Sequence, residues 1–199
     1  NTETRRRGNG MKKKNKGKYF AISLLAAGIL LTGCGRNETT QAEGKVETIE
    51  TGVLKAGMNL EQPPMGYVDE ESARPAGFQA EVAEQIAEKL GLKLEIIETT
   101  QGNLLKSLDA DLYDCVISMV GIDEWNSEKY AATNVYCDVS GLEDVLEEMP
   151  DSTQIAVFGK KGSKLIPMIE TQALEPLKKE GTLSEISQRL LGRDIIVEE

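Results

Sequence analysis

Apolar residues between positions 53 and 137 alternate between short runs typical of strands and patterns typical of amphipathic helices. Phe78, Val82, Ile86 and Leu90 recur every four residues, and Gly91 follows as a helix-ending residue. Strands are expected at 53–58, 92–97 and 115–120, and helices at 78–90 and 103–108. This alternation predicts an α/β fold with a mostly parallel sheet and right-handed crossovers.

The apolar run Cys115 to Val120 ends abruptly in small and polar residues. Open α/β sheets bind ligands just beyond the carboxyl ends of such strands. We therefore expect a ligand site between Ser118 and Asn126. Two other segments, 61–66 with its paired prolines and the turn-rich 69–77, are expected to be loops.

The C-terminal part predicts one more strand and two helices. The strand is expected at Ile155 to Phe158, and Ser163 is a candidate cap for the helix that follows. Pro176 is expected to kink or split that helix. Thr182 and Glu185 have capping-box spacing and predict a last helix that ends at Gly192.

Between these two parts, the spacing of Ser140 and Glu143 predicts a capping box and a short helix at 140–150. Its acidic residues admit two interpretations, a metal or catalytic cluster or the solvated face of an amphipathic helix, and the second is the more usual. These acids are Glu143, Asp144, Glu147 and Glu148.

The N-terminal part resembles a bacterial lipoprotein leader. Residues 11–33 combine a lysine-rich start with an apolar stretch too short for a comfortable membrane span. Leu31-Thr32-Gly33-Cys34 resembles the lipobox, which implies lipidation of Cys34, although an ordinary signal peptide is the alternative. Residues 1–10 are expected to be a non-native upstream extension, and residues 34–50 a flexible tether.

Charge and cysteine content narrow the possible functions. Eight of the 23 Lys and Arg residues, but only one of the 33 acids, precede residue 34. The remainder is strongly acidic, which argues against binding to nucleic acid. The absence of histidine from the sequence excludes His-based metal sites and His-dependent nucleophilic catalysis. Cys115 and Cys137 are expected to be buried free thiols, with a disulfide as the alternative.

Several motifs in order resemble the first lobe of the type II periplasmic binding proteins, specifically extracellular solute-binding protein family 3. The resemblance covers about Val53 to Cys137 and resumes at Ile155. Its motifs are Val53-Leu54-Lys55-Ala56-Gly57, Pro63-Pro64, Gly77-Phe78-Gln79-Ala80-Glu81, Lys89-Leu90-Gly91, Tyr113-Asp114, Gly159-Lys160-Lys161-Gly162 and Lys178-Lys179-Glu180-Gly181-Thr182. The family implies a Rossmann-like lobe on the extracytoplasmic face of the membrane that serves an ABC permease.

The second lobe of that family has no room in this chain. Only residues 138–153 stand where it would be inserted, whereas a domain needs roughly 50 residues. We therefore expect a single lobe at 51–199, built from 51–137 and 154–199, with the short helix at 140–150 replacing the second lobe.

The resemblance also implies which positions would face a ligand, and many of them have changed. Asn126 stands where relatives hold the amino-acid carboxylate with an arginine, and Gly121 stands at a hydroxyl position. Asn59 replaces an acid, and the other candidates are Gln62, Met65, Gln101, Ser118 and Met119. The changes predict weak or lost binding, because a charged hydrogen bond contributes about 1.5 to 3 kcal/mol. Drift on an unused surface is the alternative interpretation.

The leading hypothesis is a one-lobed substrate-binding lipoprotein of an amino-acid ABC importer, without catalytic residues, cofactor or metal. One alternative is an interaction module, or the product of a decaying gene, without a ligand. A second is a dehydratase-like enzyme that uses Glu61, Asp123 or Glu124. Trp125 offers either a stacking face for a ligand or a packing contact on a short helix.

Overall fold

The computed structural model describes residues 46–198, which lie in one compact unit. The expected upstream extension at 1–10, the leader at 11–33, Cys34 and most of the tether lie outside the described residues. The last tether residues, 46–50, pack against the body of the protein. The Ile49 N–H donates to the Asp114 carboxylate at 2.6 Å, and Glu50 forms an ion pair with Lys55 at 3.0 Å.

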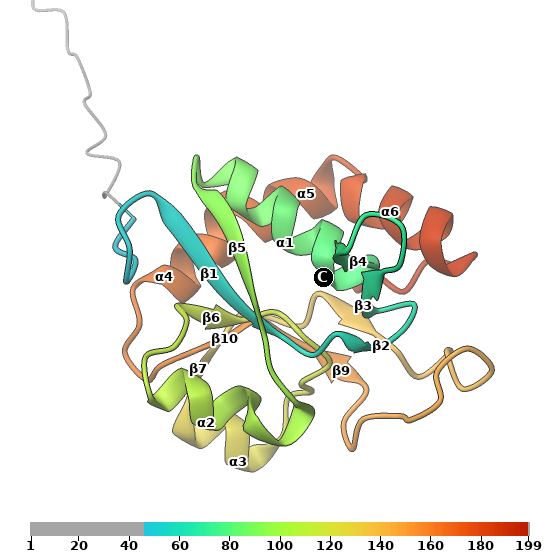
Figure 1. The fold of residues 1–199 in the computed structure, drawn as a ribbon, viewed down its shortest axis with the longest axis horizontal. Coiled ribbons are helices and arrows are strands. Elements are labelled where there is room, and N and C mark those ends of the chain that lie inside the picture. The colour runs from blue at the N-terminus through green and yellow to red at the C-terminus, as the bar shows by residue number, and fades with distance from the viewer. Residues whose placement is uncertain (1–45, 199) are drawn as a thin grey trace, which may run out of the picture. The chain divides into compact units, whose positions relative to one another are not determined.

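A five-stranded sheet in the order β5-β1-β6-β10-β7 forms the centre of the fold (Figure 1). β1 (Val53–Met58) pairs in parallel with both β5 (Lys93–Glu98) and β6 (Cys115–Val116). β10 (Phe158–Gly159) and β7 (Ala131–Ala132) complete the other side with antiparallel pairing. The expected α/β class and mainly parallel sheet are confirmed.

Helices cover both faces of this sheet (Figure 1). α1 (Phe78–Lys89) lies on one face with the C-terminal helices, and it ends as expected at Gly91, whose φ is +67°. α2 (Leu104–Asp109), which follows the 3₁₀ turn η1 (Gln101–Asn103), lies on the other face with α3 (Glu124–Lys129). Two apolar cores result, one on each face of the sheet.

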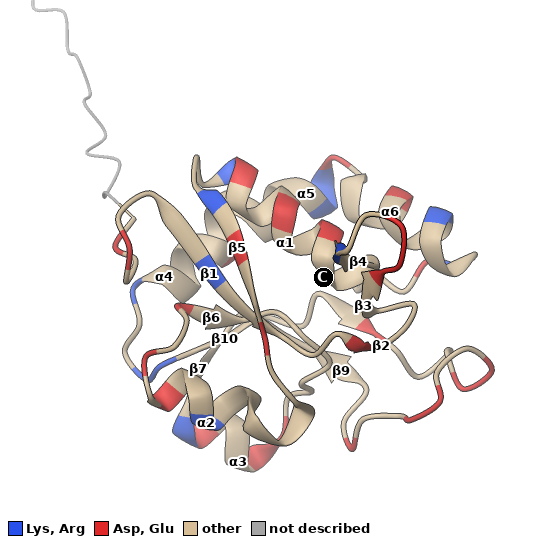
Figure 2. Ribbon diagram, in the orientation of Figure 1, with Lys and Arg blue, Asp and Glu red and all other residues tan. Residues whose placement is uncertain are grey.

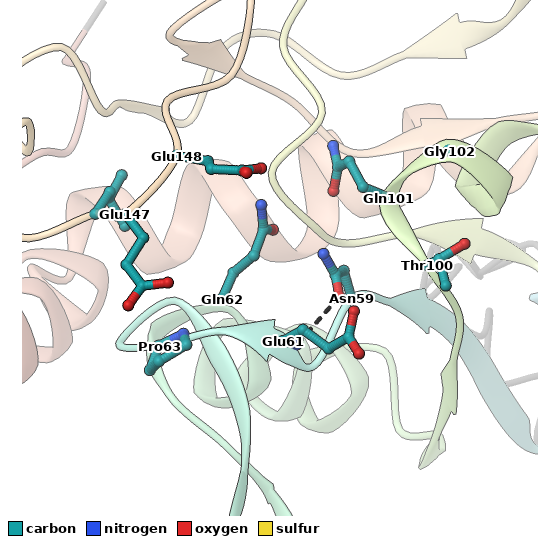
Figure 3. A pocket seen from close by; sticks show the side chains of 10 residues that line it. Asn59, Glu61, Gln62, Pro63, Thr100, Gln101, Gly102, Glu147 and Glu148 are labelled. Atoms are coloured by element: carbon teal, nitrogen blue, oxygen red, sulfur yellow. Dashed lines mark hydrogen bonds between the residues drawn. The ribbon is translucent and has the colours of Figure 1, made fainter.

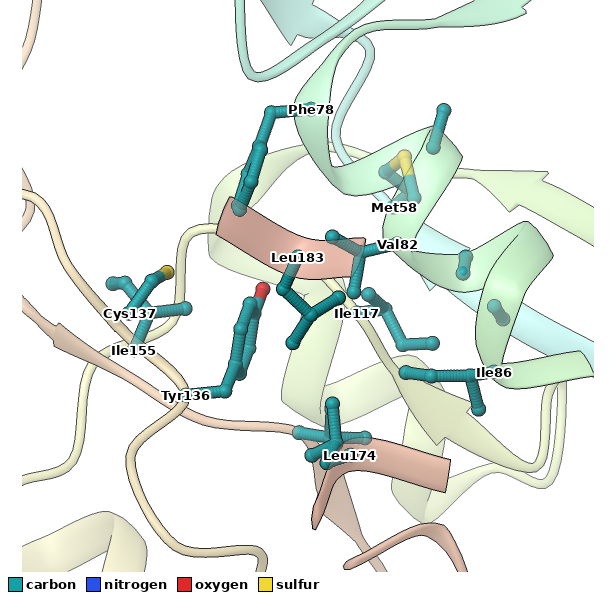
Figure 4. Close-up of a cluster of buried hydrophobic side chains, with 14 of the residues drawn as sticks. Met58, Phe78, Val82, Ile86, Ile117, Tyr136, Cys137, Ile155, Leu174 and Leu183 are labelled. Atoms are coloured by element: carbon teal, nitrogen blue, oxygen red, sulfur yellow. The ribbon is translucent and has the colours of Figure 1, made fainter. Parts of the chain in front are cut away.

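The larger core packs α1 against the C-terminal helices and the chain around Tyr136 (Figure 4). Phe78 stacks on Tyr136 with ring centroids 6.5 Å apart. Cys115 and Cys137 are both buried free thiols, which confirms that expectation. Burial raises the pKa of both thiols, so they are inert, protonated core residues at neutral pH.

The segment 61–77 is more regular than the expected loops. β2 (Glu61–Gln62), β3 (Gly66–Asp69) and β4 (Arg74–Ala76) form a small antiparallel sheet. The two prolines lie in the turn between β2 and β3, where neither has to donate to the ladder. The paired prolines stand outside the ladder as expected, whereas the sequence does not predict the three short strands.

Two expected strands are shorter than the sequence predicts. β6 ends at Val116 rather than Val120, although the next residue still donates from Ile117 N–H to the Gly57 carbonyl at 3.1 Å. The run 155–158 divides between β10 and β9 (Gln154–Ile155), which pairs with β8 (Cys137–Asp138) in a separate two-stranded sheet. The residues of both runs that lie outside the strands are still buried, because their apolar side chains pack into the two cores.

The prediction of a helix at 140–150 is wrong, because this segment is a series of turns. Ser140 donates its N–H to the side chain of Asp138 at 2.9 Å, so no capping box forms with Glu143. Leu142 and Leu146 are buried in the larger core, on the inner side of the turns. Tertiary burial of these two leucines has outweighed the local helical pattern. We call residues 138–153 the bridging segment.

The C-terminal helices follow the expected order, and two of their expected signals hold. The Ser163 hydroxyl accepts from the Leu165 N–H at 3.2 Å, and the last helix ends at Leu191, directly before Gly192. α4 (Leu165–Met168) continues through the π-helical η2 (Ile169–Leu174) into α5 (Glu175–Lys179). Pro176 stands at the start of α5, so the helix changes its winding before the proline, which cannot donate an N–H. α6 (Thr182–Leu191) has no side-chain cap, which contradicts its expected capping box.

No helix among residues 46–198 has the length and apolar character needed to cross a membrane.

Candidate functional site

A pocket of about 390 Å³ lies beyond the carboxyl ends of β1 and β5 (Figure 3). Asn59 directly follows β1, and Thr100 closely follows β5. Ligands bind at this end of the strands in open α/β sheets, and the volume suits a small solute. The lining residues are Asn59, Glu61, Gln62, Pro63, Thr100, Gln101, Gly102, Leu146, Glu147 and Glu148.

Asn59 is the most enclosed polar residue of the pocket wall, with 5% of its surface exposed. Its backbone N–H donates to the Ser118 hydroxyl, and its Oδ1 accepts from the Glu61 N–H, both at 3.1 Å. These bonds fix the orientation of the amide. Its Nδ2 has no partner among the described residues and points toward the space between Gln62 and Gln101 (Figure 3). The pocket therefore presents a positioned, unused hydrogen-bond donor.

Two glutamines complete the polar wall. The Gln101 Nε2 donates to the Met119 carbonyl at 2.8 Å, which holds this side chain at the pocket. The Oε1 of Gln62 is enclosed and accepts no hydrogen bond from the described residues. A buried acceptor without a donor costs free energy, so a donor on a bound solute would be stabilising once the Gln62 amide turns toward it.

The bridging segment supplies the opposite wall with Leu146, Glu147 and Glu148. Arg193 fixes this segment through two bonds of 3.0 Å to the Asp144 carboxylate and a third to the Gly141 carbonyl. The Arg193 guanidinium lowers the pKa of Asp144 by hydrogen bonding. The bridging segment therefore lies beside the carboxyl ends of the strands. In the family that the sequence resembles, the second lobe is inserted at this point of the chain.

Three predicted site residues are buried and do not line the pocket. Ser118 is fully buried and acts through its bond to Asn59. Met65 and Met119 have 0% and 1% of their surface exposed and belong to the larger core. Of the predicted set, the structure brings Asn59, Gln62 and Gln101 together around the pocket.

Gly121 and Asn126 form a separate, closed arrangement. The Asn126 Nδ2 donates to the Gly121 carbonyl and to Asp123, both at 3.0 Å, and only 7% of Asn126 is exposed. A Cβ on Gly121 would lie 2.1 Å from the Ser152 carbonyl oxygen, so the bridging segment covers this position. Neither residue lines the pocket.

Of the two expected roles of Trp125, the structure shows packing contacts. Its ring meets Tyr130 edge-on with centroids 6.0 Å apart, and the Lys129 ammonium lies 4.8 Å above it. The indole still has 58% of its surface exposed and does not line the pocket described above.

Sequence reasoning missed several pocket residues, namely Thr100, Gly102, Leu146, Glu147 and Glu148. The two glutamates were interpreted as part of a solvated helical face, and no local pattern reveals that the turns place them at a pocket. Within residues 46–198, no group of three or more acids or cysteines has an arrangement suited to a metal ion.

Comparisons with known proteins agree with this fold. Residues 54–193 match the family model described as bacterial extracellular solute-binding proteins, family 3. The chain is 28% identical over 116 residues to the L-cystine-binding protein TcyJ of Escherichia coli, covering 58% of this chain and 43% of that protein. It is 31% identical over 143 residues to a probable amino-acid ABC transporter-binding protein of Haemophilus influenzae, covering 71% of this chain and 54% of that one.

One curated relative is an enzyme, the cyclohexadienyl dehydratase of Pseudomonas aeruginosa, 33% identical over 75 residues that make up 38% of this chain and 28% of that protein. Among solved structures, the arginine-bound domain 1 from TmArgBP superimposes with a TM-score of 0.53 at 28% identity, covering 63% of this chain and 94% of that domain. The chain spans about half the length of these binding-protein relatives. With a matching family model over most of its length, the chain belongs to the bacterial extracellular solute-binding proteins, family 3.

Proposed function

We propose that this chain is a one-lobed substrate-binding lipoprotein of an amino-acid ABC importer, and that it binds a small polar solute in the pocket of Asn59, Gln62 and Gln101. The family and the relatives that are named as amino-acid-binding proteins support this class of function. The observation that carries the proposal is the fixed, almost fully enclosed Asn59, whose unused Nδ2 points into a pocket at the strand ends.

Binding in this pocket is proposed to be weak. Two-lobed binding proteins enclose their ligand by closing one lobe on the other. Residues 138–153 are too few to form a lobe, and they provide only a short wall. Water therefore keeps access to one side of the solute, where it competes for the same hydrogen bonds.

Calorimetry on the full chain with the standard amino acids tests this proposal. We expect dissociation constants weaker than micromolar, and Asn59→Ala to abolish the measurable binding. Asn134→Ala, at an exposed position outside the pocket, is the matched control and should leave binding unchanged. Micromolar affinity for a standard amino acid would contradict weak binding, and no binding of any solute at millimolar concentration would contradict a retained site.

The proposed address is the extracytoplasmic face of the membrane, with Cys34 lipidated and an ABC permease as partner. Known family members are extracytoplasmic, and the motif Leu31-Thr32-Gly33-Cys34 supports the anchor. Radiolabelled fatty acid should be incorporated into the chain but not into the Cys34→Ser variant. Equal labelling of both would refute the anchor.

The two other functions have less support. An interaction module needs an accessible apolar surface, but Leu142 and Leu146 are buried in the protein's own core. A dehydratase is supported by a relative that matches over 75 residues, fewer than the relatives named as amino-acid-binding proteins match. We therefore propose a binding protein rather than an enzyme.

A further inference from the structure

The pocket is lined by acids without a compensating base. Glu61 comes from β2, whereas Glu147 and Glu148 come from the bridging segment, and no Lys or Arg is among the described lining residues. The charge-coloured view agrees, because the loop before β9 carries acidic patches and no basic ones (Figure 2). None of these three carboxylates forms an ion pair with a described residue, so their charges remain available to a bound solute.

The neutral groups of the wall are arranged for the same kind of solute. The Asn59 Nδ2 requires an acceptor, such as a carbonyl or hydroxyl oxygen, because its Oδ1 is already bonded to the Glu61 N–H. The Gln62 Oε1 lacks a donor. An ammonium or guanidinium supplies donors to the glutamine and the acids, and a neutral oxygen elsewhere in the solute satisfies Asn59.

The chain offers nothing in this pocket to neutralise a carboxylate. Asn126 is closed onto Gly121 and Asp123, away from the pocket wall. A carboxylate on the solute would therefore stand near three negative charges without a cationic partner, and like charges at close range are unfavourable.

We propose that the pocket selects a small cation that carries an ammonium or guanidinium group and a neutral oxygen acceptor, and that a free carboxylate on the solute, as in an amino acid, weakens its binding. Glu147 and Glu148 are the specificity-determining residues, because they hold the cation from the side that the bridging segment provides. The inference rests on the proposed solute binding at this pocket and adds the chemical class of the solute.

Ligand-observed NMR titrations on the full chain, at low ionic strength, test the selectivity. The probes are L-argininamide, which has the guanidinium and a carboxamide oxygen, L-arginine, L-glutamine and L-glutamate. We expect argininamide to bind most tightly, arginine less tightly and glutamate least. Argininamide binding should weaken severalfold when salt is raised to about 0.5 M, because exposed charges are screened. Glutamine binding should hardly change.

The double variant Glu147→Gln/Glu148→Gln should weaken argininamide binding about tenfold, since each exposed pair contributes little alone. Glutamine binding should change less than twofold. Glu143→Gln is the matched control: it removes one charge from the same segment but does not line the pocket. Equal or tighter binding of glutamine or glutamate, or an unaffected double variant, would overturn the cation selectivity alone. No binding of any of the four probes would overturn the proposed function together with this inference.

Discussion

The sequence predicts that Asn59 and Asn126 belong to one site, but the structure places them in two different environments, a pocket and a closed loop. In the pocket, the Asn59 Nδ2 is held in place and left without a partner among the described residues. In the loop, the Asn126 Nδ2 is used by Gly121 and Asp123, and Ser152 covers Gly121. The residue type alone therefore does not show whether a side chain can bind a ligand. The neighbours of an asparagine decide whether its amide N–H is free for a ligand or is bonded within the protein.

The bridging segment connects the two regions, because it covers the loop and forms one wall of the pocket. Loss of its buried leucines should have the largest effect. We expect Leu142→Ala to lower the free energy of unfolding by about 2 to 5 kcal/mol, since a fully buried leucine leaves a cavity. Urea unfolding measures this. Leu112→Ala, with 56% of Leu112 exposed, is the control and should stay within about 0.5 kcal/mol. Equal effects would mean that the segment is not packed.

The closed loop predicts a smaller loss for Gly121→Ala. The added Cβ would meet the Ser152 carbonyl at 2.1 Å, so backbone must shift, and such overpacking costs about 1 to 3 kcal/mol. Gly102→Ala, in open space at the pocket, is the matched substitution and should be neutral or slightly stabilising. A stable Gly121→Ala variant with unchanged unfolding would show that the bridging segment does not close this loop.

Asn126→Ala sharpens the comparison between the two amides. It removes the donor to the buried Gly121 carbonyl, and we expect a loss of about 1 kcal/mol in unfolding free energy. Solute binding should be unaffected, whereas Asn59→Ala should act mainly on binding. If Asn126→Ala weakened solute binding tenfold at unchanged stability, the site would have to be extended to this loop.

The smallest expected effect is a pH dependence from Asp144. Arg193 lowers the pKa of Asp144 from its ordinary value of 3.8 in the folded protein. A lowered folded-state pKa stabilises the protein above the unfolded-state pKa, and this contribution is lost as the pH falls through the folded value. Asp144→Asn should therefore be less stable than the unchanged protein at pH 7, and the difference should shrink as the pH falls below about 4.

Asp151→Asn is the control for this titration, because Asp151 is exposed and has no ion pair in the described part of the chain. Thermal unfolding at a series of pH values measures both variants. A difference between Asp144→Asn and the unchanged protein that persists undiminished at low pH would show that the Arg193 pair does not act through the charge of Asp144.

Local sequence patterns correctly predicted α1 and β1. The period-four spacing of Phe78, Val82 and Ile86, followed by Gly91, predicted α1 almost residue for residue. The run at 53–58 coincides with β1. The two predicted capping boxes do not form. The Ser140 N–H donates to Asp138, and Thr182 is the first helical residue after the N-cap Gly181. Of the candidate site, the sequence identified the glutamines and Asn59 but also included Met65 and Met119, whose burial no local pattern reveals.

The sequence by itself determined the α/β class, the positions of β1 and α1 and, through its motifs, the membership of the family, because the spacing of residues can be followed along the chain. Only the tertiary structure decided that the segment 140–150 is a series of turns and that Glu147 and Glu148 lie at the pocket. The physical reason is that the burial of Leu142 and Leu146 in the larger core stabilises the turns more than a weak helical preference stabilises a helix. The residues that these leucines contact are distant in the sequence, so no local pattern reveals them.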